Sequence, residues 1–206
     1  ITPTRELAVQ VADVMKRLGE VIGAKVSAVL GGRDFFDQKD KLEGISHIVV
    51  GTPGRILEHV RKGSVSLSGV RFWVLDEVDE MLQRGFLDDV AQLAALFSNK
   101  HQTLVCSATL PEEVVNLSKQ IMTDGKLIDI SKDTLDTKHI QHIAVKVSSE
   151  KKRWALLELL KRANPFLALV FCSSKDSAVQ TEAWLAQEKQ LTDVLQGDMS
   201  QSKRLQ

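Results

Sequence analysis

The chain has 206 residues, of which 43% are apolar and 26% are charged, as is typical of a globular protein with a sizeable core. Its 27 Lys and Arg residues balance its 27 Asp and Glu residues, so the formal net charge is +0. This balance excludes a partner held mainly by bulk electrostatics, such as a coat of DNA or an anionic membrane. It leaves open a nucleic acid that is held by a few well-placed groups.

The sequence contains neither a membrane span nor a signal peptide, since no run reaches about 18 apolar residues. The two cysteines, Cys106 and Cys172, each end an apolar run, and no metal-binding spacing joins them. They predict reduced thiols in an intracellular protein, cytoplasmic or nuclear.

The chain begins with Ile1 and ends at Gln206 in a polar stretch typical of a helix start. We therefore expect a fragment.

Strand-length apolar runs alternate with helical periodicity from the N-terminus onward. Helices are predicted where apolar residues share one face, within 7–18, 87–97, 114–122, 154–160 and 178–185. Strands are predicted at Val26–Leu30, His47–Val50, Phe72–Leu75, Thr103–Cys106, Leu127–Ile130, His142–Val147, Leu167–Phe171 and Thr192–Leu195. Buried strands joined by helices indicate parallel sheets, so the fold class is α/β. The three tryptophans fall within apolar periods and are expected in the core.

A polar stretch without periodicity separates two α/β patterns. We interpret residues 133–138 as a linker between a first domain, 1–132, and a second domain that starts at 139.

A cluster of carboxylates follows the strand Phe72–Leu75. Asp76, Glu77 and Asp79 occupy three of four consecutive positions, where they would repel one another unless a cation lay among them. A Mg²⁺ ion carrying a nucleotide phosphate would fit, with Asp76 in the metal shell and Glu77 orienting a water. The alternative is purely structural, with Asp79 capping the next helix.

Ser107 and Thr109 follow the next predicted strand, Thr103–Cys106. The stretch from Thr109 to Glu112 has the form of a capping box, which would account for Thr109. Ser107 is then free to form a hydrogen bond to a neighbouring carboxylate, and Asp79 on the adjacent strand end is the candidate.

Three further strand ends or helix starts carry groups suited to phosphate. Thr4 and Arg5 precede the first helix, Gly31-Gly32 follows the strand Val26–Leu30, and Thr52-Pro53-Gly54-Arg55 follows the strand His47–Val50. Hydroxyls, arginines, helix N-termini and a bare backbone can together hold successive backbone phosphates. Ordinary helix-start rules also account for Pro53. With 5% aromatic residues and no Tyr, base stacking is not expected to carry recognition.

These motifs together resemble the DEAD-box family of ATP-dependent RNA helicases, within superfamily 2. The resemblance rests on an ordered series of segments: Pro3–Ala8, Gly31-Gly32, Thr52–Arg55, Val74–Asp79, Ser107–Thr109, Val170–Ser174 and Gly197–Arg204. It implies two RecA-like domains, both incomplete in this chain, which close on ATP and RNA. One departure is Val78, which stands where Ala is usual in that family.

The resemblance also implies roles for individual residues. Asp76 and Glu77 would handle Mg²⁺ and the hydrolytic water, and Asp79, Ser107 and Thr109 would couple the ATP site to RNA. The RNA backbone would be held by Thr4, Arg5, Gly32, Thr52, Gly54, Arg55, Gln201 and Arg204. The expected cofactors are ATP and Mg²⁺, and the expected partners are RNA, bound with little sequence specificity, and protein cofactors.

The chain holds no Gly-x-x-x-x-Gly-Lys-Ser/Thr loop and none of that family's late motifs. We therefore expect the 206 residues alone to neither hydrolyse ATP nor unwind RNA, because the groups that compensate phosphoryl charge are absent. We also expect them to fold poorly, because the strand that would precede the phosphate loop and pair centrally in the first sheet is missing, which leaves apolar edges exposed. Two alternatives remain: a superfamily 2 DNA helicase, and a truncated, non-catalytic RNA-binding or scaffold module.

Overall fold

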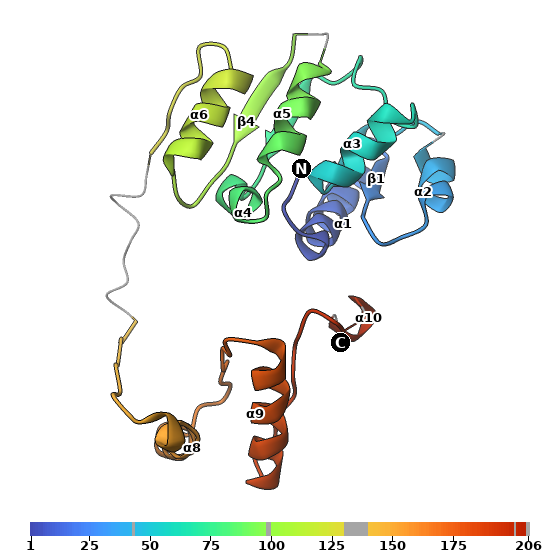
Figure 1. The fold of residues 1–206 in the computed structure, drawn as a ribbon. Helices are drawn as coiled ribbons and strands as arrows, with labels where there is room; N and C mark the ends of the chain where they lie inside the picture. The colour runs from blue at the N-terminus through green and yellow to red at the C-terminus, as the bar shows by residue number, and fades with distance from the viewer. Residues whose placement is uncertain (43, 98–99, 130–139, 200, 205–206) are drawn as a thin grey trace. The chain divides into compact units, whose positions relative to one another are not determined.

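The computed structural model describes residues 1–42, 44–97, 100–129, 140–199 and 201–204. It divides into two units, Ile1–Asp136 and Thr137–Gln206 (Figure 1), and each is described by itself. The predicted linker, 133–138, lies outside the described residues, so the domain boundaries that we infer from sequence remain a prediction.

The first unit alternates helices and short strands. It contains α1 (Arg5–Ile22), β1 (Val26–Val29), α2 (Phe35–Leu42), β2 (Ile48–Gly51), α3 (Pro53–Arg61), β3 (Phe72–Leu75), α4 (Val78–Gln83), α5 (Leu87–Ala95), β4 (Gln102–Val105) and α6 (Glu112–Ile121). The four strands confirm four of the predicted strands to within one residue at each end. The fold class, α/β with parallel strands, is confirmed as well.

Two parallel pairs of strands form the sheets of the first unit: β1 pairs with β2, and β3 pairs with β4. Helices cover both faces of the β1–β2 pair. On one face Leu30 and Val50 pack against Ala8 of α1, and on the other Val29 packs with Ile56 of α3. Such two-sided burial explains why these strands are almost wholly apolar.

The first two residues lie between the two pairs of strands. The amino group of Ile1 donates to the carbonyl of Val74 (2.7 Å), and the carbonyl of Ile1 accepts from the amide of Asp76 (3.0 Å). The amide of Thr2 donates to the carbonyl of Gly51 at the end of β2 (3.0 Å). The N-terminal segment therefore joins the carboxyl end of β3 to that of β2.

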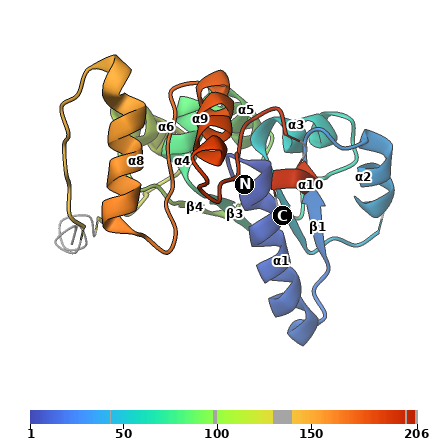
Figure 2. The same cartoon turned by 90° about the horizontal axis from the view of Figure 1, so that it is seen from below.

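The regular elements that the structure describes in the second unit are all helical. Its elements are a 3₁₀ turn (Ser149–Lys151), α8 (Lys152–Ala163), α9 (Lys175–Gln187) and α10 (Gln201–Arg204), seen from below in Figure 2. Helix α9 begins at Ser174, whose hydroxyl accepts a hydrogen bond from the amide of Ser177, as an N-cap residue does.

The prediction of further strands is wrong for the described residues. Residues 127–129, 142–147, 167–171 and 192–195 contain no strand, and Ile130 lies outside the described part. A strand obtains its hydrogen bonds only from a neighbour, and no described strand lies beside these runs. Most of their side chains are exposed, among them Leu127 (71%) and Phe171 (93%).

Candidate functional site

The acidic cluster lies where β3 ends, as predicted. Asp76 is half-buried and Glu77 is exposed. Glu77 has φ 54° and ψ 54°, a left-handed backbone conformation that L-residues adopt at a cost. Among the described residues, the Asp76 carboxylate makes no hydrogen bond or ion pair, although its charge reaches the thiol of Cys106. Both carboxylates are thus available at the strand end.

Asp79 lies beside them but points into a network of hydrogen bonds. Its Oδ2 accepts from the amide (2.9 Å) and the hydroxyl (2.7 Å) of Thr109, and the residue is buried. Burial acts to raise the pKa of the Asp79 carboxyl, but the hydrogen bonds, above all those from Thr109, hold the pKa below its ordinary value. Asp79 therefore stays charged and ties β3 to the segment after β4.

Both local capping interpretations are wrong. The N-cap residue of α4 is Glu77 rather than Asp79, and it makes no side-chain cap. Helix α6 begins at Glu112 after Pro111, again without a side-chain cap, so Thr109 does not start it. The long-range bond between Asp79 and Thr109 occupies both groups instead.

Ser107 lies next to Asp79, as expected, and its hydroxyl forms hydrogen bonds with backbone groups of Asp79 and Thr109. Its Oγ accepts from the amide of Asp79 (3.2 Å) and donates to the carbonyl of Thr109 (2.6 Å). The amide of Val78 also donates to the carbonyl of Cys106 (3.2 Å). The ends of β3 and β4, here called the acidic edge, are therefore held together by several hydrogen bonds.

Thr4 and Arg5 stand at the start of α1. The hydroxyl of Thr4 accepts from the amide of Leu7 (3.2 Å) and caps the helix. The guanidinium of Arg5 lies against the Gly31-Gly32 backbone, so close that a Cβ on Gly32 would be 2.4 Å from its Nη1. Gly32 also has φ +73°. The positive φ favours glycine at this position, and any side chain there would displace the Arg5 guanidinium.

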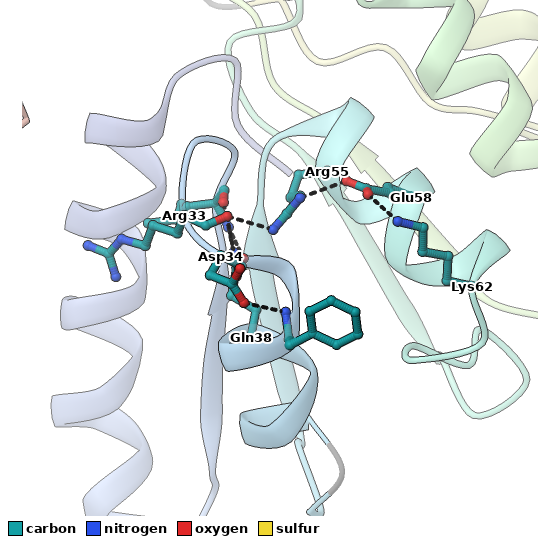
Figure 3. A network of polar contacts seen from close by, with 8 residues as sticks. Arg33, Asp34, Gln38, Arg55, Glu58 and Lys62 are labelled. Atoms are coloured by element: carbon teal, nitrogen blue, oxygen red, sulfur yellow. Dashed lines mark hydrogen bonds and ion pairs between the residues drawn. The ribbon is translucent and has the colours of Figure 1, made fainter.

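The segment Thr52–Arg55 begins α3. Thr52 is the N-cap residue and makes no side-chain cap bond, so its hydroxyl is not used by the helix. A Cβ on Gly54 would lie 3.0 Å from Oδ2 of Asp89. Arg55 donates from Nη1 to Glu58 (2.7 Å) and from Nη2 to the carbonyl of Arg33 (2.8 Å), as Figure 3 shows.

Sequence reasoning missed how α2 and α3 hold the loop between Gly31 and Asp34. Buried Gln38 exchanges hydrogen bonds with the backbone of Leu30, 2.7 and 3.0 Å long. The ring of Phe35 stacks on buried His59, with centroids 4.2 Å apart, and lies near the cations of Arg55 and Lys62. In the sequence, Phe35 and the charged residues of Arg55–Lys62 match no known motif, so their contacts could not be predicted.

The last two predicted RNA-binding residues belong to the second unit. Gln201 and Arg204 begin and end the short helix α10. The side chain of Gln201 is not among those described. The two units are described separately, so the RNA-binding role of Gln201 and Arg204 stays a prediction.

The carboxylates at the end of β3 are the type of ligand that magnesium prefers. Mg²⁺ binds through one or two carboxylates together with waters and phosphate oxygens, which is what Asp76 and Glu77 offer. No group of three or more His, Cys, Asp or Glu side chains in the described residues forms a ready-made metal cage. Within the same part of the chain, no helix is both long and apolar enough to cross a membrane.

Residues 1–117 match the sequence model of the DEAD/DEAH box helicase family. Because this match covers more than half of the 206 residues, the chain belongs to the DEAD/DEAH box helicase family.

Individual relatives agree with that membership. The chain is 37% identical over 204 residues to the ATP-dependent RNA helicase DbpA of Bacillus subtilis, covering 99% of this chain and 43% of that protein. It therefore spans less than half the length of this curated relative. It is similar to the crystal structure of a DEAD box protein from the hyperthermophile Methanococcus jannaschii, with 37% identity, a TM-score of 0.60 and coverage of 99% of this chain and 55% of that one.

A more distant structure supports the fold alone. Dbp5 of S. cerevisiae, in a variant bound to RNA and ADP BeF3, gives a TM-score of 0.77 at 24% identity over 99% of this chain and 52% of that one. These neighbours show that the parallel strands of the first unit belong to a RecA-like domain.

Proposed function

We propose that the whole protein, meaning this chain with any flanking segments that its gene encodes, is an ATP-dependent RNA helicase that couples ATP hydrolysis to local duplex unwinding or RNP remodelling. The names of its relatives support the activity, since DbpA and others are ATP-dependent RNA helicases. The chain itself has no phosphate loop, so the proposal concerns the whole protein.

One observation carries the proposal: a single short segment connects the acidic edge to the loops suited to RNA. The carbonyl of Ile1 accepts from the amide of Asp76, and the amide of Thr2 donates to Gly51, directly before Thr52. Thr4 and Arg5 follow at once, and Arg5 lies on Gly32. A shift at the acidic edge would therefore be passed through hydrogen bonds to the loop at Thr52, and through the N-terminal segment and Arg5 to the loop at Gly32.

The proposal gives individual residues the roles that the family resemblance implies. Asp76 and Glu77 would hold Mg²⁺ and orient water, while bound Mg-ATP supplies the phosphoryl group to be transferred. Asp79, Ser107 and Thr109 would transmit changes between β3 and β4. Thr4, Arg5, Gly32, Thr52, Gly54 and Arg55 would hold the RNA backbone, joined by Gln201 and Arg204 from the second unit.

Several finer points belong to the same proposal. Binding through phosphate and ribose would be largely independent of RNA sequence. The two free cysteines, Cys106 and Cys172, fit an intracellular protein, cytoplasmic or nuclear. Protein cofactors are further proposed partners.

The test compares Glu77→Gln with wild type in the whole protein. Loss of the group that orients water should lower RNA-stimulated ATP turnover about 10²-fold or more while binding of Mg-ATP persists. Glu113→Gln is the matched control, because Glu113 is exposed in the first turn of α6, and it should keep wild-type turnover.

Three results would contradict the proposal. Turnover of Glu77→Gln equal to wild type would remove Glu77 from the chemistry. Stimulation and unwinding with DNA duplexes but not RNA would favour a DNA helicase. RNA binding without any ATP turnover in the wild-type protein would favour a non-catalytic RNA-binding module.

A further inference from the structure

Three arginines converge on the loop Gly31–Asp34, here called the arginine loop. Arg33 belongs to the loop itself. Arg5 lies against the glycines of the loop, and Arg55 donates to the carbonyl of Arg33. In Figure 3 the Arg33 side chain extends from the loop on the side opposite Arg55. Three guanidinium groups thus gather around a loop whose acidic neighbours are Asp34 and Glu58.

Arg33 and Arg55 differ in how far their charge is compensated. The Arg55 side chain is 12% exposed and ion-paired to Glu58 at 2.7 Å. Arg33 is exposed, and its guanidinium makes no hydrogen bond or ion pair with any described residue. The adjacent carboxylate of Asp34 is engaged elsewhere, because it accepts from the amides of Phe36 (2.7 Å) and Asp37 (3.1 Å) at the start of α2.

The backbone that carries Arg33 is held firmly. The Arg33 carbonyl accepts from Arg55 at 2.8 Å and from Gln38 at 3.4 Å. Gln38 is 5% exposed and also holds Leu30 just before the loop. An anchored loop loses little entropy on binding, so a free guanidinium on it is well prepared for an anionic ligand.

We propose that Arg33 contacts an RNA phosphate directly and that Arg55, besides any RNA contact of its own, positions the arginine loop. Arg33 is outside the motif residues assigned above, and the inference rests on the proposed function. A guanidinium can offer a phosphate two parallel N–H donors. The contact recognises the backbone and not the base, in keeping with the other groups around this loop.

The test measures binding of a fluorescent single-stranded RNA to the whole protein by anisotropy over a series of salt concentrations. Arg33→Gln should weaken binding for every RNA sequence and should reduce the slope of log K against log salt by about 0.7, the value for one lost phosphate contact on a single strand. Arg33→Lys should keep most of that slope because it keeps the charge. Arg33→Glu should weaken binding further than Arg33→Gln.

Arg17→Gln is the control, since Arg17 is an exposed arginine in the C-terminal half of α1; it should keep the wild-type slope. An unchanged slope in both Arg33→Gln and Arg33→Glu would overturn this inference alone. Failure of the wild-type protein to bind RNA would instead overturn the proposed function. Equal thermal midpoints for wild type and variants establish that a lost contact, rather than unfolding, causes the change.

Discussion

The two units both carry strand-length apolar runs, yet only the first turns them into described strands. In the first unit, β3 lies beside β4 and its Leu75 is fully buried. In the second unit the run 167–171 has no described strand beside it, and Leu169 is 74% exposed. The difference shows that an apolar run specifies burial only when a partner supplies backbone hydrogen bonds.

The tryptophans show the same contrast. Trp73 of β3 is 5% exposed, and its ring lies 4.8 Å from that of Phe97. Trp154 of α8 is 61% exposed, although both were expected in the core. A helix closes its own backbone hydrogen bonds, so α8 needs no neighbouring strand to satisfy its backbone.

The largest expected effect comes from truncating matched leucines in the two units. Leu75→Ala removes a fully buried side chain and should lower the free energy of unfolding of the first unit by about 2–5 kcal/mol. Leu169→Ala removes a side chain already in solvent and should change the free energy of unfolding of the second unit by less than about 0.5 kcal/mol. Urea unfolding of the whole protein measures both, in variants that keep as their only tryptophan Trp73 for the first unit or Trp184 for the second.

A loss of equal size for the two leucines would break the comparison. It would mean that Leu169 is buried in solution, with the run 167–171 paired as a strand. Protection of those amides from hydrogen exchange would distinguish that outcome from a change in the unfolded state.

Sequence patterns predicted the first unit well because its elements follow local rules. Periodicity located α1 and the four strands, and Gly23, in a left-handed conformation with φ 70°, ends α1 as a C-cap glycine does. The same patterns failed for the second unit because strand pairing is a long-range property. No local signal distinguishes a run such as 142–147 from β3.

The candidate site was predictable in its motifs but not in its contacts. Parallel strands place their carboxyl ends at one edge, so Asp76 and Thr52 were identified from position alone. Whether Asp79 caps a helix or binds Thr109 depends on tertiary structure, and the capping prediction was wrong. Arg33 was missed for a similar reason, since its lack of a partner can only be seen once its neighbours are placed.

A second, smaller effect is expected where the acidic edge joins β3 to β4, a link that the described part of the second unit lacks. Asp79→Asn removes the charge and replaces one of the two acceptor oxygens by an N–H donor, so either the Thr109 groups or the Glu80 amide loses its acceptor; it should cost about 1–3 kcal/mol in unfolding free energy. Asp13→Asn is the control, because Asp13 forms an exposed ion pair with Lys16 and should cost less than about 1 kcal/mol.

The same variant should alter the acid dependence of stability. The pKa of Asp79 is lowered from 3.8 in the folded chain, so its contribution is present above that value and is lost as the pH falls below it toward the folded pKa. Asp79→Asn should flatten unfolding free energy against pH in this acid range. A wild-type curve with the same slope as the variant would contradict the assignment of that pKa shift to Asp79.

The smallest effect concerns His59 of the first unit, which we compare with His142 of the second. His59 is fully buried in the first unit, and neither ring nitrogen has a hydrogen-bond partner among the described residues. Burial lowers the pKa of His59 from 6.5, the cations of Arg55 and Lys62 lower it further, and Glu58 acts in the opposite direction. His142, in the second unit, is exposed.

Because the folded pKa of His59 is depressed, its neutral ring contributes full stability above pH 6.5, and that stability is lost as the pH falls and the unfolded chain takes up the proton. The slope should not exceed about 1.4 kcal/mol per pH unit. His59→Phe keeps a ring to stack on Phe35 and removes the titration, so urea midpoints of this variant should vary less between about pH 7 and pH 5. His142→Phe controls for the introduction of a phenylalanine at an exposed position. Urea midpoints of His59→Phe that varied with pH as much as those of the wild type would contradict the assignment of this pH dependence to His59.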